Sequence, residues 1–264
     1  MRLGCNTVAC AGQPVAAALQ AIAWAGYDGV EFSPMHLSPD DPGSARAAVE
    51  RARELGLQTV AIEAAGNLFD EKVRARLFHF FNLAGNVGIP VVSTGSAGPP
   101  TTDGLKGFVA VARDVAAAAE SAGVRWALKA HVGAAVHGTD DLLQVLEAVG
   151  RPSLVVNFDP THLQRQGEDP AASARRLAGR IGHVHIRDYD SPDQKIGSPD
   201  GQIPGRGRVD LAAVLGALGA AGYDGFLDLE IIGAQGWDPV RQMGIIAEGR
   251  GYLHRLLCAA AAAR

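Results

Sequence analysis

Short apolar runs alternate with longer segments in which apolar residues recur at helical spacing, from one end of the chain to the other. Short runs rich in β-branched residues are typical of buried strands, and the longer Ala-rich segments are typical of amphipathic helices. The segments predicted to form strands are residues 3–9, 29–32, 57–62, 90–93, 125–131, 154–158, 181–186 and 225–231. The segments predicted to form helices are residues 15–24, 44–55, 70–86, 105–122, 139–149, 170–177, 210–221 and 239–257.

This regular alternation of strand and helix predicts parallel strands that are joined by crossover helices. A barrel of eight such units has about 250 residues, which is close to the 264 residues of this chain. We therefore expect an α/β fold with a single (β/α)8 TIM barrel. No linker-like composition divides the chain, so residues 1–264 are expected to form one domain with a frayed tail at 258–264.

Composition and charge exclude several classes of function. The net charge is −4 and Lys and Arg form no basic stripe, so we expect no nucleic-acid partner. No uncharged apolar run is long enough to cross a bilayer, and the N-terminus lacks the apolar core of a signal peptide. Cys5, Cys10 and Cys258 lack metal-ligand spacing and indicate unpaired thiols in a reducing compartment. We expect a soluble cytoplasmic protein with no membrane partner.

Three polar residues lie where three consecutive predicted strands end. Asp159 follows LVVNF, His185 lies in IGHVHI, and Glu230 lies in FLDLEII. The carboxyl ends of barrel strands meet on one face, so these side chains should converge there. Two carboxylates and one imidazole can bind a divalent metal ion and leave positions open for substrate oxygens. Each residue alone would be an ordinary polar group at the barrel mouth, but the three together favour a site.

Four segments carry a resemblance to a known family: NFDPTHL (157–163), GHVHIRD (182–188), PGRGRVD (204–210) and YDGFLDLE (223–230). The pattern resembles the xylose isomerase-like TIM barrels, the sugar phosphate isomerase/epimerase family, over essentially the whole chain. That superfamily includes ketose 3-epimerases, inosose dehydratase and endonuclease IV. The resemblance implies one divalent metal ion (Mn, Mg, Co or Zn) bound by Asp159, His185 and Glu230. It also implies that His162 contacts the substrate.

Strand five departs from the family pattern. Many members carry a fourth metal ligand there, a glutamate, whereas this chain reads WALKAH with Lys129 at that position. A protonated Lys129 beside a divalent ion would be repelled by several kcal/mol at an intermediate dielectric. Three outcomes are open: the ammonium replaces the metal, a neutral Lys129 lies beside it, or Lys129 turns away and His131 completes the ligand set. A retained metal is favoured because Asp159, His185 and Glu230 are all present.

The departure also affects the expected mechanism. A 3-epimerase of this family uses two carboxylates on opposite faces of an enediolate, and the second carboxylate is missing here. We therefore expect a one-base isomerisation, a dehydration or a retro-aldol-like cleavage. In this scheme Glu230 removes a proton, Lys129 or the metal stabilises the oxyanion, and His131 or His162 moves a second proton. The ordinary alternative for Lys129 is an ion pair that ties strands five and eight together.

Several further polar residues are candidates for substrate binding. Glu63 ends strand three and could bind hydroxyl groups, while Asp188 and Arg206 lie in the long segment after strand seven. A cationic side chain there could meet a phosphate or a carboxylate, although solvated loop charges are the ordinary alternative. The full set of expected substrate-binding residues is His131, Glu63, His162, Asp188 and Arg206.

The leading hypothesis is a sugar isomerase/epimerase-like enzyme. It would move a proton next to a carbonyl of a sugar, a cyclitol or a related polyhydroxy compound, and we expect a homodimer or homotetramer, as in many family members. One alternative is a lyase or dehydratase in which Lys129 replaces the metal. Another is a barrel that binds a ligand without turnover. A nuclease of the endonuclease IV type needs more His and carboxylate ligands and a basic rim, which this chain lacks.

Overall fold

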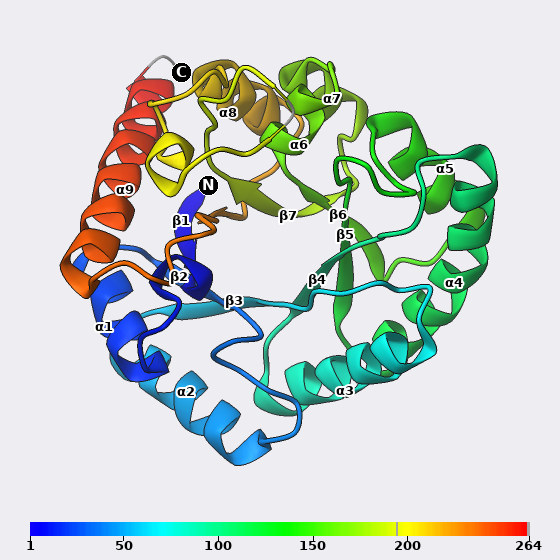
Figure 1. Cartoon of the computed structure of the whole chain (residues 1–264), viewed down its shortest axis with the longest axis horizontal. Helices are drawn as coiled ribbons and strands as arrows, with labels where there is room; N and C mark the ends of the chain where they lie inside the picture. The colour runs from blue at the N-terminus through cyan, green and yellow to red at the C-terminus, as the bar shows by residue number, and fades with distance from the viewer. Residues whose placement is uncertain (194, 263–264) are drawn as a thin grey trace.

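Eight parallel strands form a closed barrel in sequence order in the computed structural model, which describes residues 1–193 and 195–262 (Figure 1). Each strand pairs in parallel with its neighbours in the chain, and β8 closes the barrel against β1. The strands are β1 Arg2–Asn6, β2 Gly29–Phe32, β3 Gln58–Glu63, β4 Val91–Gly95, β5 Arg125–Lys129, β6 Leu154–Phe158, β7 Ile181–Ile186 and β8 Phe226–Leu229. The predicted (β/α)8 TIM barrel is confirmed.

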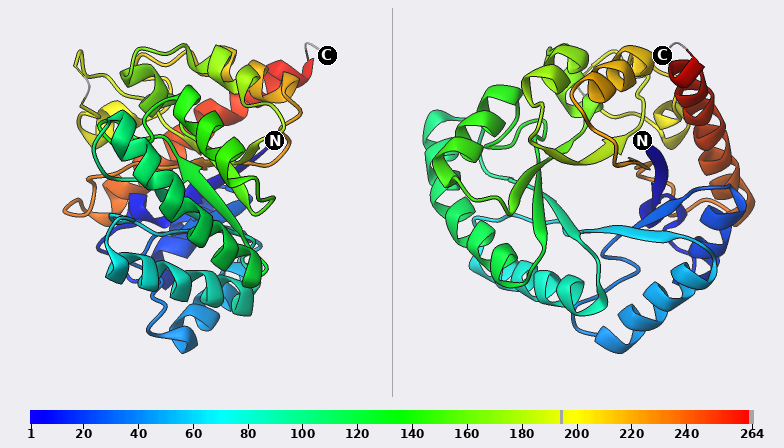
Figure 2. Two further views of the ribbon diagram at one scale, coloured as in Figure 1. Left: turned by 90° about the vertical axis from the view of Figure 1, so that its right-hand side faces the viewer. Right: turned by 180° about the vertical axis from the view of Figure 1, so that it is seen from behind.

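The helices form an outer ring around the barrel, which the side and rear views in Figure 2 also show. The helices are α1 Val15–Trp24, α2 Pro42–Glu54, α3 Glu71–Val87, α4 Thr102–Ser121, α5 Thr139–Val149, α6 Pro160–Arg165, α7 Pro170–Arg176, α8 Leu211–Ala220 and α9 Pro239–Ala262. Two short 3-10 helices, Thr7–Cys10 and Pro199–Gln202, lie in the loops after β1 and β7. Within the described residues, no helix combines the length and the hydrophobicity that crossing a bilayer would require.

Aspartate side chains determine where several helices begin. Asp41, Asp70 and Asp210 each accept a backbone N–H from the first turn of the helix that follows, which satisfies a donor with no partner inside the helix. Asp159 does the same for α6, where it accepts the N–H groups of Thr161 and His162. One residue therefore ends β6, caps α6 and faces the barrel mouth.

Alternate side chains of β8 divide the barrel interior into layers. Phe226 belongs to a small apolar cluster with Val60 and Val91. A Cβ atom at Gly29 would lie 2.5 Å from the Phe226 ring, so only glycine leaves room for that ring. Asp228, two residues further along, is fully buried in a polar layer. Glu230 follows directly after β8 and lines the open mouth. The floor is thus apolar and the mouth is polar.

Some predicted element boundaries differ from the structure. The chain forms α6 directly after β6, where no helix was predicted. The closing helix α9 continues through Ala262, beyond the predicted end at residue 257. Residues 263 and 264 lie outside the described residues. Ala is the strongest helix former, which accounts for the extension through the Ala-rich end.

Candidate active site

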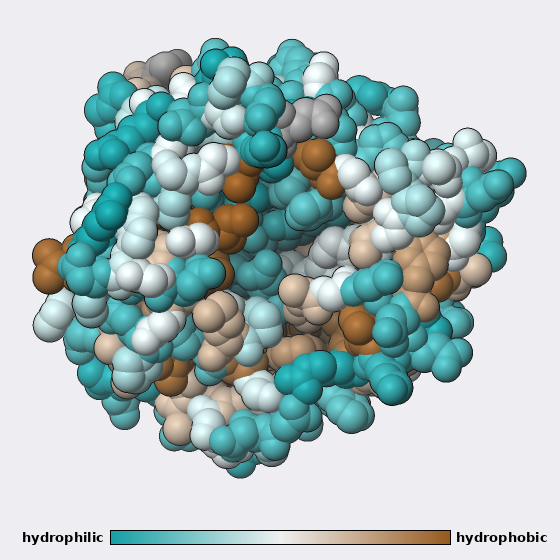
Figure 3. All heavy atoms as spheres, in the orientation of Figure 1, coloured by the Kyte–Doolittle hydropathy of each residue, from teal (hydrophilic) through white to brown (hydrophobic). Residues whose placement is uncertain are grey.

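A cavity of about 360 Å³ opens at the carboxyl ends of the strands, where the face shown in Figure 3 is hollowed near its centre. Its charged and imidazole-bearing lining residues come from several strand ends and from the loops that follow them. These residues are Glu63, Lys129, His131, His162, Arg165, His185, Arg187 and Glu230. Small apolar residues, among them Ala64, Ala97 and Ala134, form much of the remaining wall. The cavity is large enough for a small organic molecule.

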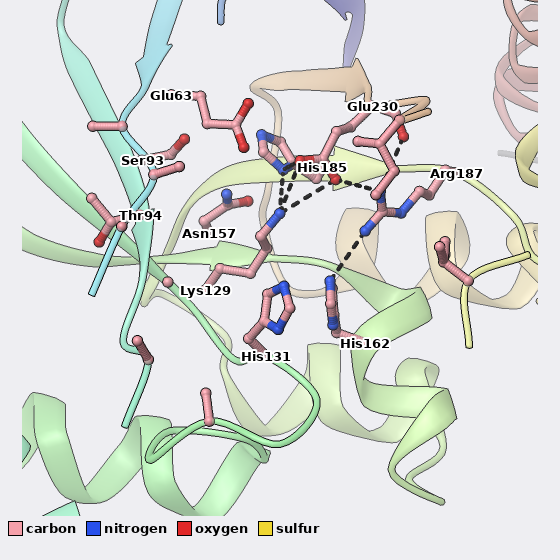
Figure 4. Close-up of a pocket in the computed structure, with 18 of the residues that line it drawn as sticks. Glu63, Ser93, Thr94, Lys129, His131, Asn157, His162, His185, Arg187 and Glu230 are labelled. Carbon is pink, nitrogen blue, oxygen red and sulfur yellow. Dashed lines mark hydrogen bonds and ion pairs between the residues drawn. The ribbon is translucent and has the colours of Figure 1, made fainter. Parts of the chain in front are cut away.

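The ammonium group of Lys129 lies at the centre of the residues that the strand ends bring together. Its Nζ atom is 3.0 Å from Glu230 Oε1, 3.0 Å from His185 Nδ1 and 3.7 Å from Asp159 Oδ2. Only 6% of the Lys129 surface is exposed. These four side chains extend from the ends of β5, β6, β7 and β8, and the structure brings them together as the sequence pattern predicted. Figure 4 shows Lys129, His185 and Glu230 pointing toward one another.

Arg187 is a second buried cation in the same group. Its NH1 atom lies 2.8 Å from Glu230 Oε2, and its NH2 atom lies 3.3 Å from Asp159 Oδ2. Arg187 was not among the predicted site residues, because a charge in a loop after a strand is usually solvated. A signal was present, since Arg187 follows His185 by two residues and so points to the same side of the chain.

A buried glutamate from the opposite side of the barrel holds the His185 ring. His185 Nε2 lies 2.6 Å from Glu31 Oε2, and Ser93 and Asn6 donate hydrogen bonds to the same carboxylate at 2.8 Å and 3.1 Å. His183, one layer deeper, lies 3.3 Å from Glu31 Oε1. Glu31 therefore fixes the orientation of the imidazole, a role that was not predicted for it from the sequence.

Six buried side chains together form what we call the charged cluster: Glu31, Lys129, Asp159, His185, Arg187 and Glu230. Burial opposes charge on His185, but Glu31 and Glu230 raise its pKa to about 10. Burial likewise opposes charge on Glu230, but Arg187 and Lys129 hold its pKa well below the usual range. The pKa values of Glu31 and Asp159 are lowered and those of Lys129 and Arg187 are raised, which favours the ionised forms, and His185 Nδ1 lies 3.2 Å from Glu230 Oε1, where a charged ring can donate. Three cations then face three carboxylates.

Glu63 lies beside the charged cluster and has a different protonation behaviour. Burial, and then the negative charge of Glu230, raise the pKa of Glu63 to about 7. Its carboxylate accepts a hydrogen bond of 3.0 Å from Asn6, and it faces the cavity across from Lys129 (Figure 4). Glu63 is therefore a carboxyl group in the cavity that can take up and release a proton near neutral pH.

Two histidines whose rings pack at a tilt line another part of the wall. The rings of His131 and His162 lie 4.0 Å apart, and burial lowers the pKa of both. The backbone N–H of Val132 donates to His162 Nδ1 at 3.2 Å. Arg187 NH2 lies 3.1 Å from His162 Nε2, and because a guanidinium group only donates, Nε2 accepts in this contact; Asp159 Oδ2 is 3.7 Å from the same nitrogen. Both ring nitrogens of His162 therefore face N–H donors, one from the backbone of Val132 and one from Arg187.

A family model described as the xylose isomerase-like TIM barrel matches residues 19–256. This chain belongs to that family. An inosose dehydratase of Clostridium beijerinckii is 27% identical over 124 residues, which is 42% of this chain and 42% of that protein. The matched segment therefore spans less than half of that relative. An L-ribulose 3-epimerase of Mesorhizobium japonicum is 28% identical over 229 residues, 78% of this chain and 71% of that protein.

Solved structures support the fold of this xylose isomerase-like barrel. A fusion protein of a xylose isomerase-like TIM barrel with a 4-hydroxyphenylpyruvate dioxygenase superposes with a TM-score of 0.83. It is 24% identical, and the match covers 97% of this chain and 42% of that chain. The IolI protein, solved with a bound zinc atom, gives a TM-score of 0.76 at 18% identity over 94% of this chain and 96% of that one.

Two residues that were expected to bind substrate lie away from the cavity. Asp188 points to the other side of the chain from Arg187, and it accepts the backbone N–H groups of Gly205 and Val209, both at 3.0 Å. Arg206 forms an exposed ion pair with Glu248 at 2.6 Å. Neither Asp188 nor Arg206 lines the cavity, so the structure does not support either as a substrate contact. Asp188 instead holds the long loop after β7.

The family resemblance implied a metal ion, and the expected ligand atoms do converge. Asp159, His185 and Glu230 each offer an atom, and these atoms lie within 4.8 Å of one another, so this part of the expectation is confirmed. Metal–ligand bonds of this kind are about 2.0–2.2 Å long. An ion bonded to all three residues would be in contact with the ammonium nitrogen of Lys129, and like charges would repel it. With Lys129 in this position, the three residues do not fit a divalent ion.

Proposed function

We propose that this barrel is an enzyme that moves a proton on a carbon next to the carbonyl of a polyhydroxy compound, such as a sugar or a cyclitol. The observation that carries the proposal is Glu63, a carboxyl group with a pKa of about 7 inside a cavity that also contains the buried cation Lys129. A base with a pKa near the working pH and a fixed positive charge are the two groups that enolisation requires.

The reaction begins when the Glu63 carboxylate takes the proton from the carbon next to the carbonyl. The electrons of the broken C–H bond form a C=C bond, and the carbonyl electrons move to the oxygen, which becomes an enolate oxygen. The ammonium of Lys129 lines the cavity and stabilises this charge, because it can donate a hydrogen bond to the enolate oxygen. No solvent needs to reorganise around the new charge.

The fate of the enolate determines the reaction class. If protonated Glu63 delivers its proton to the former carbonyl carbon while the hydroxyl proton on the carbon that was deprotonated moves to the enolate oxygen, the carbonyl changes place and the reaction is an isomerisation. If a hydroxyl group on the next carbon takes a proton and leaves as water, the carbonyl re-forms and the reaction is a dehydration. Protonated Glu63, which holds the proton taken from the carbon, can supply the proton for that departure.

The general base in this proposal is Glu63, whereas the sequence pattern pointed to Glu230. Both oxygens of Glu230 lie within 3.3 Å of Lys129 Nζ, and Arg187 NH1 is 2.8 Å from Oε2. These cations hold the pKa of Glu230 well below its usual range against the opposing effect of burial, so it is a weak base. Glu230 instead positions the ammonium. One mobile carboxyl group favours isomerisation or dehydration over a two-base epimerisation.

The named relatives are consistent with this chemistry. The matched proteins are called an inosose dehydratase and an L-ribulose 3-epimerase, and both names describe a reaction on a polyhydroxy carbonyl compound. The same chemistry is proposed here for this chain, with a small carbohydrate-like molecule as its substrate. The cytoplasmic location and the homodimer or homotetramer that were expected from the sequence stay predictions.

A screen for proton exchange tests the proposed function before any substrate has been identified. The protein is incubated in D₂O with ketoses, inososes and 3-keto sugars, and proton NMR follows the signal of the hydrogen next to each carbonyl. We expect at least one compound to lose this signal faster than in buffer alone, with or without formation of a product. If no compound of these three classes loses the signal faster than in buffer alone, the proposed function is contradicted.

A further inference from the structure

The position of Lys129 also determines whether a metal ion can bind at the mouth of the barrel. We infer that this barrel holds no divalent metal ion at its mouth and that the ammonium group of Lys129 occupies the place of that ion. This ammonium lies in the site for which a function is proposed above, but the evidence for its role and the test of that role do not depend on any substrate.

The first observation is the set of atoms around the ammonium nitrogen. Lys129 Nζ lies 3.0 Å from His185 Nδ1, 3.0 Å and 3.3 Å from the two oxygens of Glu230, and 3.7 Å from Asp159 Oδ2. These are the three residues whose atoms converge as a candidate metal-ligand set. The ammonium therefore contacts all three of them and fills the space between them.

The second observation is the charge that already faces the two carboxylates. Arg187 NH1 lies 2.8 Å from Glu230 Oε2, and Arg187 NH2 lies 3.3 Å from Asp159 Oδ2. Lys129 and Arg187 supply two positive charges to the two carboxylates Asp159 and Glu230, so the pair is neutralised. A divalent ion would add two uncompensated positive charges in a buried site, where charge repulsion is poorly screened.

The third observation is that His131, the alternative metal ligand, does not point at the ligand atoms of Asp159, His185 and Glu230. The ring of His131 packs at a tilt against His162 with ring centres 4.0 Å apart, and His131 Nδ1 lies 3.3 Å from the backbone oxygen of Val132. His131 therefore does not complete a ligand set with Asp159 and Glu230. Lys129 itself is 6% exposed and is held by ion pairs, so the side chain is not turned out to solvent.

The chemical consequence is that a fixed ammonium, and not a metal ion, faces the substrate oxygen. An ammonium donates hydrogen bonds to oxygen and can stabilise an enolate, but it does not bind two substrate oxygens in the manner of a metal ion with open coordination positions. Metal dependence is thus expected to be absent, although the barrel keeps the Asp, His and Glu residues of a metal site.

Titration with Mn²⁺ tests the inference directly. The purified protein is treated with a chelator, dialysed and titrated with Mn²⁺, and electron paramagnetic resonance measures the free ion. Mn²⁺ is chosen because Cys258 Sγ and His254 Nε2 lie 3.6 Å apart near the protein surface, where they could bind Zn²⁺. The wild-type protein is expected to bind no stoichiometric Mn²⁺, and its metal content before chelation is expected to be far below one ion per chain.

Substitution of the lysine should create the missing site. The variant Lys129→Glu removes the ammonium and adds a carboxylate, and it is expected to bind one Mn²⁺ per chain at least about 100-fold more tightly than the wild type. Lys129→Met removes only the charge and should bind Mn²⁺ with an intermediate affinity. The control Lys106→Glu makes the same change of charge on the exposed face of α4 and should behave like the wild type.

Two results would overturn the inference. One is a wild-type protein that binds one Mn²⁺ per chain as tightly as Lys129→Glu does. The other is a folded Lys129→Glu variant, with a circular dichroism spectrum like that of the wild type, that gains no affinity. If Lys129→Glu does not fold, the wild-type titration and Lys129→Met decide the question. None of these measurements involves turnover, so their failure is distinct from a failure of the exchange screen.

Discussion

The guanidinium group of Arg187 lies 2.8 Å from Glu230 Oε2, and the ammonium group of Lys129 contacts the same carboxylate at 3.0 Å from Oε1 and 3.3 Å from Oε2. Two buried cations therefore hold Glu230 as an anion. A carboxylate held in this way is a positioning group and a poor proton acceptor. The same arrangement leaves Glu63, which has no cation within ion-pair distance among the described residues, as the carboxyl group that can move a proton.

The rate of the reaction should follow the ionisation of Glu63. The pKa of Glu63 is raised to about 7, by burial and by the charge of Glu230, and only the ionised form accepts a proton. For a substrate found in the exchange screen, kcat/KM is expected to rise as the pH increases through about 7 and then to level off, because kcat/KM reports the free enzyme. A profile that is already flat from pH 5 to pH 7, as for an ordinary glutamate (pKa about 4.3), would exclude Glu63 as the base.

Removal of the Lys129 charge should destabilise the fold. Lys129→Met leaves Asp159 buried with Arg187 as its cation partner, and Glu230 buried with Arg187 and His185. We expect a loss of about 3 kcal/mol in the free energy of unfolding at pH 7, as is typical when one partner of a buried pair is removed. Urea denaturation measures it. The exposed control Lys106→Met should show no resolvable change, and an equal effect in both variants would contradict the assigned role of the cluster.

Stability should decrease on the alkaline side because of His185. Burial opposes its charge, but Glu31 and Glu230 raise the pKa of His185 to about 10. The unfolded value is about 6.5, so the folded state binds the additional proton between these two values. The stabilisation is complete below about pH 6.5 and is lost as the pH rises toward 10.

The variant His185→Gln isolates this contribution. It removes the titrating ring, so its free energy of unfolding should fall less steeply than that of the wild type between pH 7 and pH 10. Denaturant unfolding at a series of pH values gives both curves. Parallel curves for the two proteins would show that His185 is not charged in the folded state.

Substitutions of Asp188 and Arg206 should have different effects on stability and KM from substitutions of a substrate-binding residue. Asp188→Asn weakens the acceptor for the N–H groups of Gly205 and Val209, so we expect a lower melting temperature. Arg206→Ala removes an exposed pair with Glu248 and should leave KM close to the wild-type value. A large increase in KM for Arg206→Ala would place that residue at the substrate after all.

The barrel was predictable because its strands are short apolar runs that alternate with amphipathic segments over the whole chain. The helix α6 was not, because Pro160–Arg165 is too short to show a helical period. Its signal is local: Asp159 caps the first turn and Pro160 occupies the first helical position. Short helices of this kind depend on caps more than on periodicity.

The site was predictable only in part. The strand ends indicated that four side chains would meet, those of Lys129, Asp159, His185 and Glu230. The alternation of side chains along β7 also places Arg187 inward and Asp188 outward, but it was not applied to these two residues in the prediction of the site. Protonation states were not predictable, because they depend on distances across the barrel. The proximity of Glu230 raises the pKa of Glu63, and no sequence pattern records that proximity.

The central claim is that Glu63 performs the proton transfer, and deuterium exchange by one variant tests it most directly. With a compound that exchanges in the presence of the wild type, Glu63→Gln is expected to lose exchange by at least about 100-fold and to keep its folded circular dichroism spectrum. The control Glu147→Gln, on the exposed face of α5, should exchange at the wild-type rate. Exchange by Glu63→Gln at the wild-type rate would contradict the claim.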